Sequence, residues 1–163
     1  MNIYHKLKIG LDYHGVVDTR IEYFTLFAKE ARKRGHQIYI ITGGPKYLVQ
    51  KKLDQHNFCY DHIFAIVDYF QAKDQVSYDA NGNFHIAEDL WNKAKGEYCR
   101  IAGIDLQIDD SLEYAKWFKT PYCFYHQESK ICILTDNQKI NLFGNIQDTL
   151  DDIEEKFAVS SKY

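Results

Sequence analysis

The feature that most constrains the fold is a regular alternation of short apolar runs with longer amphipathic segments. Residues 7–13, 36–44 and 104–111 read as strands rich in Ile, Leu and Tyr. Residues 19–34 and 87–102 instead repeat apolar side chains at helical spacing. Such alternation predicts right-handed crossovers between parallel strands, so we expect an α/β protein with a doubly wound, mostly parallel sheet.

Glycines, prolines and an Asn-Gly pair set the predicted boundaries. Gly35 ends the first helix, and Pro45 opens a second helix that runs to about His56. Residues 61–70 read as a third strand, and Asn81-Gly82 lies between alternating residues as in a β-hairpin. The helix over 87–102 is expected to bury Leu90, Trp91, Ala94, Tyr98 and Ile101.

The C-terminal third predicts a short helix over 111–118, two strands around a polar turn within 122–136, and a last helix near 145–157. The chain has 163 residues, which suits one domain, 1–163. Residues 68–86 leave room for no more than a minimal cap, a small hairpin flap, so we expect an open site.

Composition excludes several classes of partner. Apolar residues make up 45% of the chain and charged residues 26%, as in ordinary soluble domains. A formal net charge of −3 offers no basic surface for nucleic acid or for an anionic membrane. The chain start lacks the apolar core of a signal peptide, and no apolar run is long enough to span a bilayer. We therefore expect a cytoplasmic protein.

Four cysteines are far apart and form no C-x-x-C pair, which argues against a zinc or redox motif. Each lies among apolar residues, so buried, reduced thiols are expected. They are Cys59, Cys99, Cys123 and Cys132.

Polar side chains follow three of the predicted strands. Asp12, Thr42 and the pair Asp109-Asp110 each stand where an apolar run ends, and parallel strands bring such ends to one edge of the sheet. Taken singly, Asp12 is explained as well by a turn cap, and the acidic pair by the start of a helix. Together, the carboxylates would repel one another unless a cation lies between them. Mg²⁺ prefers such oxygen ligands, so we expect a magnesium site.

The segment after the second strand favours phosphate. Thr42 offers a hydroxyl donor, and Gly43 and Gly44 allow backbone N–H groups to approach an anion closely. The helix that begins at Pro45 adds the favourable end of its dipole. A nearby lysine would offset the remaining charge, and Lys95, Lys93 and Lys73 are the candidates.

The ordered set of a strand ending in Asp12, then "IITG", a lysine and "IDD" resembles the haloacid dehalogenase (HAD) superfamily, over about residues 7–118. The resemblance implies a small Mg²⁺-dependent phosphatase, similar to nucleotidase-like members. Asp12 would form an aspartyl-phosphate, and Thr42 would hold the phosphoryl group. Asp109 and Asp110, with Asp12 and the backbone carbonyl of His14, would bind Mg²⁺.

Two points stay open within this resemblance. The family pattern favours Lys95 over Lys93, with Lys73 third. Phosphatases of the superfamily usually carry a second aspartate where this chain has His14. Histidine titrates near neutral pH and can exchange protons, so His14 is either a working acid or base or a replacement that removes turnover.

Two functions therefore remain. The first is hydrolysis of a small phosphorylated metabolite, including a nucleotide, and the alternative is a catalytically impaired HAD-like binding or regulatory protein. A receiver domain uses similar residues, but there the acidic pair comes first along the chain, whereas here it comes last. An open site is also compatible with a homo-oligomer whose neighbouring subunit closes it.

Overall fold

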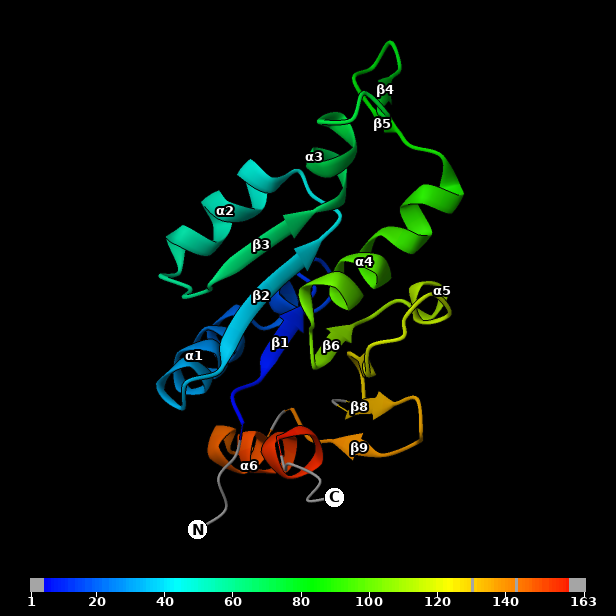
Figure 1. Cartoon of the computed structure of the whole chain (residues 1–163). Helices are drawn as coiled ribbons and strands as arrows, with labels where there is room; N and C mark the ends of the chain where they lie inside the picture. Colours follow the sequence, from blue (N-terminus) through cyan, green and yellow to red (C-terminus); the bar gives the residue numbers. More distant parts are fainter. Residues whose placement is uncertain (1–4, 130, 143, 159–163) are drawn as a thin grey trace.

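A seven-stranded, mostly parallel sheet forms the centre of the computed structural model (Figure 1), which describes residues 5–129, 131–142 and 144–158. The strand order is β3-β2-β1-β6-β7-β8-β9. The first five strands in this order are parallel, and β8 and β9 each pair antiparallel with the strand before them. This is a Rossmann-like α/β arrangement, as predicted. The strands are β1 (Lys8–Leu11), β2 (Gln37–Thr42), β3 (His62–Ala65), β6 (Leu106–Asp109), β7 (Tyr122–His126), β8 (Ile131–Leu134) and β9 (Lys139–Ile140).

Helices cover both faces of this sheet because its central strands are apolar on both sides. Ile38 and Ile40 of β2 face a core shared with α1, α2 and α6, whereas Tyr39 and Ile41 face a second cluster that includes Cys99 of α4. The period of two along a strand explains this division. The helices are α1 (Ile21–Lys33), α2 (Lys46–Gln55), α3 (Ile66–Gln71), α4 (Glu88–Ala102), α5 (Leu112–Ala115) and α6 (Ile146–Phe157), with a 3-10 turn at Val17–Thr19.

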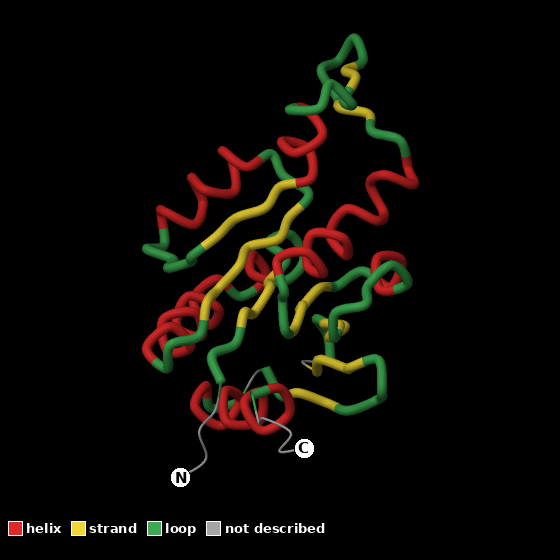
Figure 2. The backbone as a smooth tube through the Cα atoms, in the orientation of Figure 1, coloured by secondary structure: helices red, strands yellow, loops and turns green. Residues whose placement is uncertain are grey.

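The segment after β3 corrects one prediction and confirms another. The expected strand over 61–70 ends at Ala65, and the chain turns there into α3 because Ile66 and Phe70 pack with Ala94 of α4. The predicted flap over 68–86 thus begins inside a helix. Its hairpin is confirmed as β4 (Ser77–Tyr78) and β5 (Phe84–His85), and Figure 2 shows it beyond the ends of α3 and α4.

The cysteines correct the expectation of four buried thiols. Cys123 and Cys132 lie at diagonal positions of the antiparallel pair β7–β8, with Cα atoms 5.5 Å apart, and form a disulfide. Cys59 is exposed because it lies in the loop before β3, and Cys99 is the buried free thiol. Spacing along the sequence could not reveal a pairing that depends on strand register.

No helix in the described part of the chain is both long enough and apolar enough to cross a bilayer. The prediction that the chain start lacks a signal-peptide core concerns a segment whose first residues, 1–4, lie outside the described residues.

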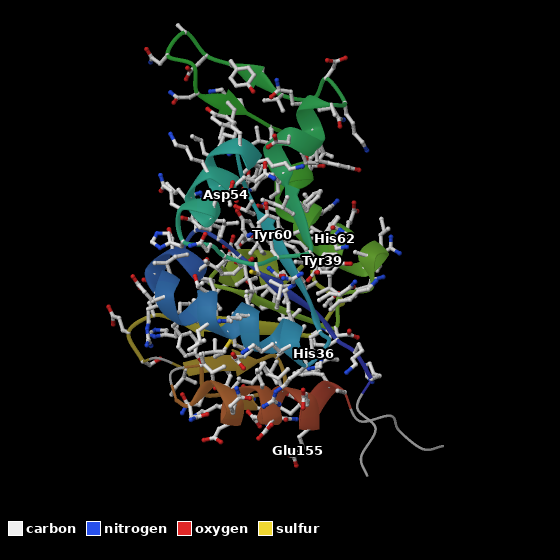
Figure 3. The ribbon with its side chains drawn as sticks, turned by 90° about the vertical axis from the view of Figure 1, so that its left-hand side faces the viewer. His36, Tyr39, Asp54, Tyr60, His62 and Glu155 are labelled. Atoms are coloured by element: carbon white, nitrogen blue, oxygen red, sulfur yellow. A yellow bond between two sulfur atoms is a disulfide. The ribbon has the colours of Figure 1, made fainter. Side chains whose placement is uncertain are left out.

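A buried hydrogen bond between His36 and Glu154 fastens α6 to the sheet. His36, next to the start of β2, accepts a hydrogen bond at Nδ1 from the Leu7 N–H (3.0 Å), so its Nε2 carries the proton that faces Glu154 Oε1 at 2.7 Å. Arg34 Nη1 lies 3.1 Å from the other oxygen of Glu154. In Figure 3 the neighbouring Glu155 points away from the molecule instead.

We predict that Glu154→Ala lowers the free energy of unfolding by about 2–3 kcal/mol, since it leaves a buried imidazole N–H without its acceptor. Glu155→Ala, an exposed change on the same helix, is the matched control and should cost less than about 0.5 kcal/mol. Urea denaturation of both variants measures the difference. Equal losses would show that the hydrogen bond to Glu154 does not fasten α6.

Candidate functional site

Three carboxylates meet where β1 and β6 end. Leu11 of β1 is paired with Ile108 of β6, and this register sets the next residues, Asp12 and Asp109, side by side. The Asp12 N–H also donates to the Ile108 carbonyl at 2.9 Å. Asp110 completes the group, in which the three residues offer oxygens that all lie within 4.8 Å of one another. The predicted convergence at the carboxyl edge is therefore present.

Lys95 of α4 lies between two of these carboxylates. Its Nζ is 3.0 Å from Asp12 Oδ1 and 2.8 Å from Asp109 Oδ2, and its side chain is 3% exposed. The other two candidates lie elsewhere: the Lys93 ammonium is 5.0 Å from the Trp117 ring, and that of Lys73 donates to Tyr69 Oη. Lys95 is thus the lysine that the fold brings to the acidic group.

Burial and charge together shift the ionisation of the group. Burial raises the pKa of Asp12 well above its ordinary value; Lys95 opposes this shift and Asp109 adds to it. Burial also lowers the pKa of Lys95, but Asp12 and Asp109 outweigh it, so the pKa of the ammonium is raised and the lysine stays charged at neutral pH. Burial, then Asp109, raises the pKa of Asp110. Burial and mutual repulsion thus favour the protonated forms of Asp12 and Asp110, and a cation placed among the three carboxylates would favour their ionised forms instead.

Neighbouring groups fix the carboxylates in place. Gln107 Nε2 donates to Asp109 Oδ2 at 3.2 Å, and the Ser111 N–H donates to Asp109 Oδ1 at 3.3 Å. Gly15 lies so close to Asp110 that a Cβ there would be 2.0 Å from Asp110 Oδ2. Gln107 was not among the residues predicted from the sequence, although an amide side chain inside an apolar run was a usable signal. In the structure this amide is fully buried.

The predicted phosphate loop lies at the end of β2. Thr42 is fully buried, and its Oγ1 accepts from the Gly44 N–H at 3.4 Å. Since β2 pairs with β1 in parallel, this loop follows the strand beside Asp12. The Lys46 N–H, at the start of α2, already donates to Asp68 Oδ2 at 2.8 Å. That amide is therefore occupied, as is the Gly44 N–H, and the loop offers chiefly the Thr42 hydroxyl.

An aromatic wall, not foreseen from the sequence, borders the site. A Cβ on Gly43 would lie 3.0 Å from the Trp91 ring, whose Nε1 donates to Tyr114 Oη at 2.6 Å. The Tyr114 ring centre in turn is 5.0 Å from Lys95 Nζ. Trp91 and Tyr114 therefore connect the glycine loop to the buried lysine. The helical spacing over 87–102 predicts only that Trp91 is buried.

His14 lies apart from the acidic oxygens. Its ring Nδ1 faces Asp18 Oδ2 at 3.6 Å, its side chain is 54% exposed, and its ring packs edge-on against Tyr13. Among the described residues, the group of possible metal ligands consists of Asp12, Asp109 and Asp110. The side chain of His14 thus faces Asp18 and is not one of these ligands.

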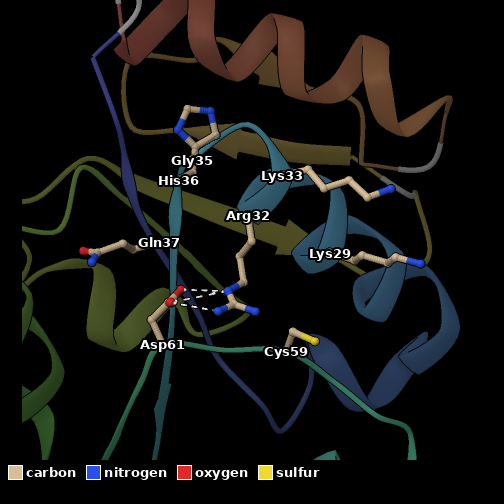
Figure 4. Close-up of a pocket in the computed structure, with 8 residues that line it drawn as sticks. All are labelled: Lys29, Arg32, Lys33, Gly35, His36, Gln37, Cys59 and Asp61. Carbon is tan, nitrogen blue, oxygen red and sulfur yellow. Dashed lines mark hydrogen bonds and ion pairs between the residues drawn. The ribbon is translucent and has the colours of Figure 1, made fainter.

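A basic cavity of about 480 Å³ lies at the amino ends of strands β2 and β3 (Figure 4). It is bordered by Gln37, which begins β2, and by Asp61, which precedes β3. Arg32 is held there by Asp61, with Nη2–Oδ1 3.2 Å. Strand direction therefore separates this cavity from the carboxylates, which stand at the carboxyl ends of the strands.

Comparison with known proteins returns little similarity. No family model matches the chain, and no curated protein matches it. A solved structure with some likeness is titled "Crystal Structure of Glycosyltransferase from Rickettsia africae ESF-5". It is 18% identical, with a TM-score of 0.43, and the match covers 73% of this chain and 29% of that one. The chain thus spans less than a third of that protein's length.

These findings correct the expectation drawn from the motifs. No HAD model matches and the structural likeness found is to a protein titled a glycosyltransferase, so the expected membership in the HAD superfamily is wrong. The phosphatase activity through an aspartyl-phosphate, and the impaired HAD-like protein kept as its alternative, rested on that membership and fall with it. The motifs are short, and any parallel sheet whose strands end in polar residues gathers a similar set at one edge.

We predict that Gly15→Ala destabilises the protein more than Gly82→Ala does. Both glycines have positive φ, +88° and +80°, but a Cβ on Gly82 would meet no atom within 4 Å. Gly82→Ala should therefore cost about 1 kcal/mol for backbone strain alone. Gly15→Ala must also displace Asp110 and should cost at least about 1 kcal/mol more. Chemical denaturation compares them, and equal costs would mean that Gly15 does not position Asp110.

Proposed function

We propose that the site at the carboxyl edge of the sheet binds a divalent cation, Mg²⁺ by its ligand chemistry, and through it a small phosphorylated molecule. The observation that carries this proposal is the group formed by Asp12, Asp109 and Asp110, whose oxygens lie within 4.8 Å of one another. Carboxylates held this close gain from a cation placed among them.

The donor set fits Mg²⁺ better than a transition metal. All three side chains offer oxygen, and neither histidine nor thiolate ligands belong to the group among the described residues. Lys95 occupies Asp12 Oδ1 and Asp109 Oδ2, so the second oxygen of Asp12 and the carboxylate of Asp110 remain for the ion. When bound, the ion would neutralise the residual charge and attract an anion.

The surrounding residues support a phosphate as that anion. Thr42 has a hydroxyl proton to donate, and Gly43 and Gly44 present backbone without side chains at the same sheet edge. The charged Lys95 adds positive potential. A phosphate group accepts from such donors and binds Mg²⁺ at the same time. Assembly into a homo-oligomer, expected from an open site, stays a prediction.

We predict that Mg²⁺ raises the unfolding temperature of the wild-type protein. At a concentration one hundred times its dissociation constant, a bound ion adds about 2.7 kcal/mol, or several degrees at this chain length. Asp110→Asn should abolish the shift by removing a ligand charge. Asp54→Asn removes an equal charge from an exposed position on α2 and should leave the shift intact.

The comparison is made by thermal unfolding with a Mg²⁺ titration at constant ionic strength. A shift of the same size in Asp110→Asn and in wild type would exclude the acidic group as the metal site. No shift in wild type would exclude Mg²⁺ binding itself.

We predict that inorganic phosphate binds in the presence of Mg²⁺ and that Thr42→Val weakens this binding about tenfold, since a charge-assisted hydrogen bond is lost. Mg²⁺ binding should be retained, because Thr42 is not a metal ligand. Thr25→Val is the control: its hydroxyl donates to the Ile21 carbonyl within α1. Isothermal titration calorimetry measures both ligands, and unchanged phosphate affinity in Thr42→Val would remove Thr42 from the site.

A further inference from the structure

A cavity of about 540 Å³ lies between α3 and α4, and the proposed metal site does not include it. Ala94 faces this cavity, whereas Lys95, the next residue, is about 100° further around the helix and faces the carboxylates. We name this cavity the α3–α4 groove. It is lined by Phe64, Tyr69, Phe70, Lys73, Gln75, Leu90, Lys93, Ala94, Glu97, Tyr98 and Ile101.

Aromatic rings form much of the groove. Phe64 and Tyr98 stack with centroids 4.2 Å apart and planes 14° apart. Tyr69 lies 5.5 Å from Phe64 at an angle of 56°, and it also contacts Phe70 edge-on. Rings presented at different angles offer both stacking and edge contacts to a further flat ring.

The rim of the groove carries positive charge. Lys73 donates to the Tyr69 hydroxyl at 2.6 Å, and the Lys93 ammonium lies 5.0 Å from the Trp117 ring. Neither ammonium forms an ion pair with a carboxylate of the described chain. The residues that line the groove include two lysines and one carboxylate, Glu97. The charge at the rim therefore favours an anion.

One apolar residue of α4 stays exposed at this groove. The helical pattern predicts that Ile101 is buried, yet its exposed fraction is 74%. Ile101 lies in the last turn of α4, at the end away from the hairpin that joins α3 to α4. A ligand in the groove would cover apolar surface that the fold leaves in water.

We propose that the α3–α4 groove binds a small aromatic molecule that carries an anionic group. The flat ring lies against Phe64, Tyr69 and Tyr98, and the anion is met by Lys73 and Lys93. The volume is that of small-molecule sites, and its few polar groups stand at the rim, where they orient the ligand. This site is independent of the proposed function, because it uses neither the carboxylates nor the loop after β2.

The test uses 8-anilinonaphthalene-1-sulfonate, an aromatic anion whose fluorescence rises in apolar surroundings. We expect saturable binding to the full chain at one molecule per protein. Circular dichroism in the near ultraviolet and cooperative unfolding are recorded for each variant, since partly unfolded chains also bind this dye.

The double variant Lys73→Ala/Lys93→Ala should bind the dye about tenfold more weakly, since two favourable charge interactions are lost. N-phenyl-1-naphthylamine, an uncharged relative of the dye, should change less than twofold. The control Lys51→Ala/Lys52→Ala removes two exposed lysines from α2 and should leave both affinities unchanged.

Ile101→Glu provides a second variant should the lysine pair prove necessary for folding, because this exposed position tolerates a charge. The new carboxylate at the groove should also weaken dye binding several-fold. Absence of saturable binding, equal affinity in wild type and in a folded groove variant, or equal loss of the charged and uncharged probes would each overturn the proposal.

Discussion

The buried ammonium of Lys95 between Asp12 and Asp109 is the interaction on which the functional edge of the molecule depends. Isolated carboxylates are costly to bury, and these two approach each other closely because β1 and β6 are neighbours in parallel register. The ammonium offsets part of their repulsion, and its pKa is raised in return. The net negative charge that remains makes this edge suited to a divalent cation.

That arrangement requires α4 to pack closely against the sheet in one position. Gly96 allows the helix to approach the backbone at Trp117, where a Cβ would be 2.4 Å from the carbonyl oxygen. Cys99 packs against Tyr39 and Ile41 in the second core cluster. The same helix turns Trp91 toward Gly43 and opens the α3–α4 groove on another side. One helix thus supports the acidic group, the aromatic wall and the groove.

Much of the architecture was predictable because it follows from local patterns. The helices over α1, α2, α4 and α6 show clear apolar periodicity, and Gly35, Pro45 and Asn145 mark their ends. The sequence predicts the shared sheet edge because each polar residue directly follows an apolar strand. It does not predict family membership, since short ordered motifs occur on unrelated sheets and the comparisons returned no HAD match. It also fails where a continuous apolar run turns from β3 into α3.

The sequence by itself determined the alternation of strands and helices, and with it which polar residues stand at the carboxyl ends of the strands, because these depend on period and on neighbours along the chain. Tertiary structure decided which of three lysines meets the carboxylates, that Cys123 and Cys132 join, and that Ile101 stays in water. These outcomes depend on register and on helix placement. Both are set by packing between residues far apart in the chain, which no local pattern encodes.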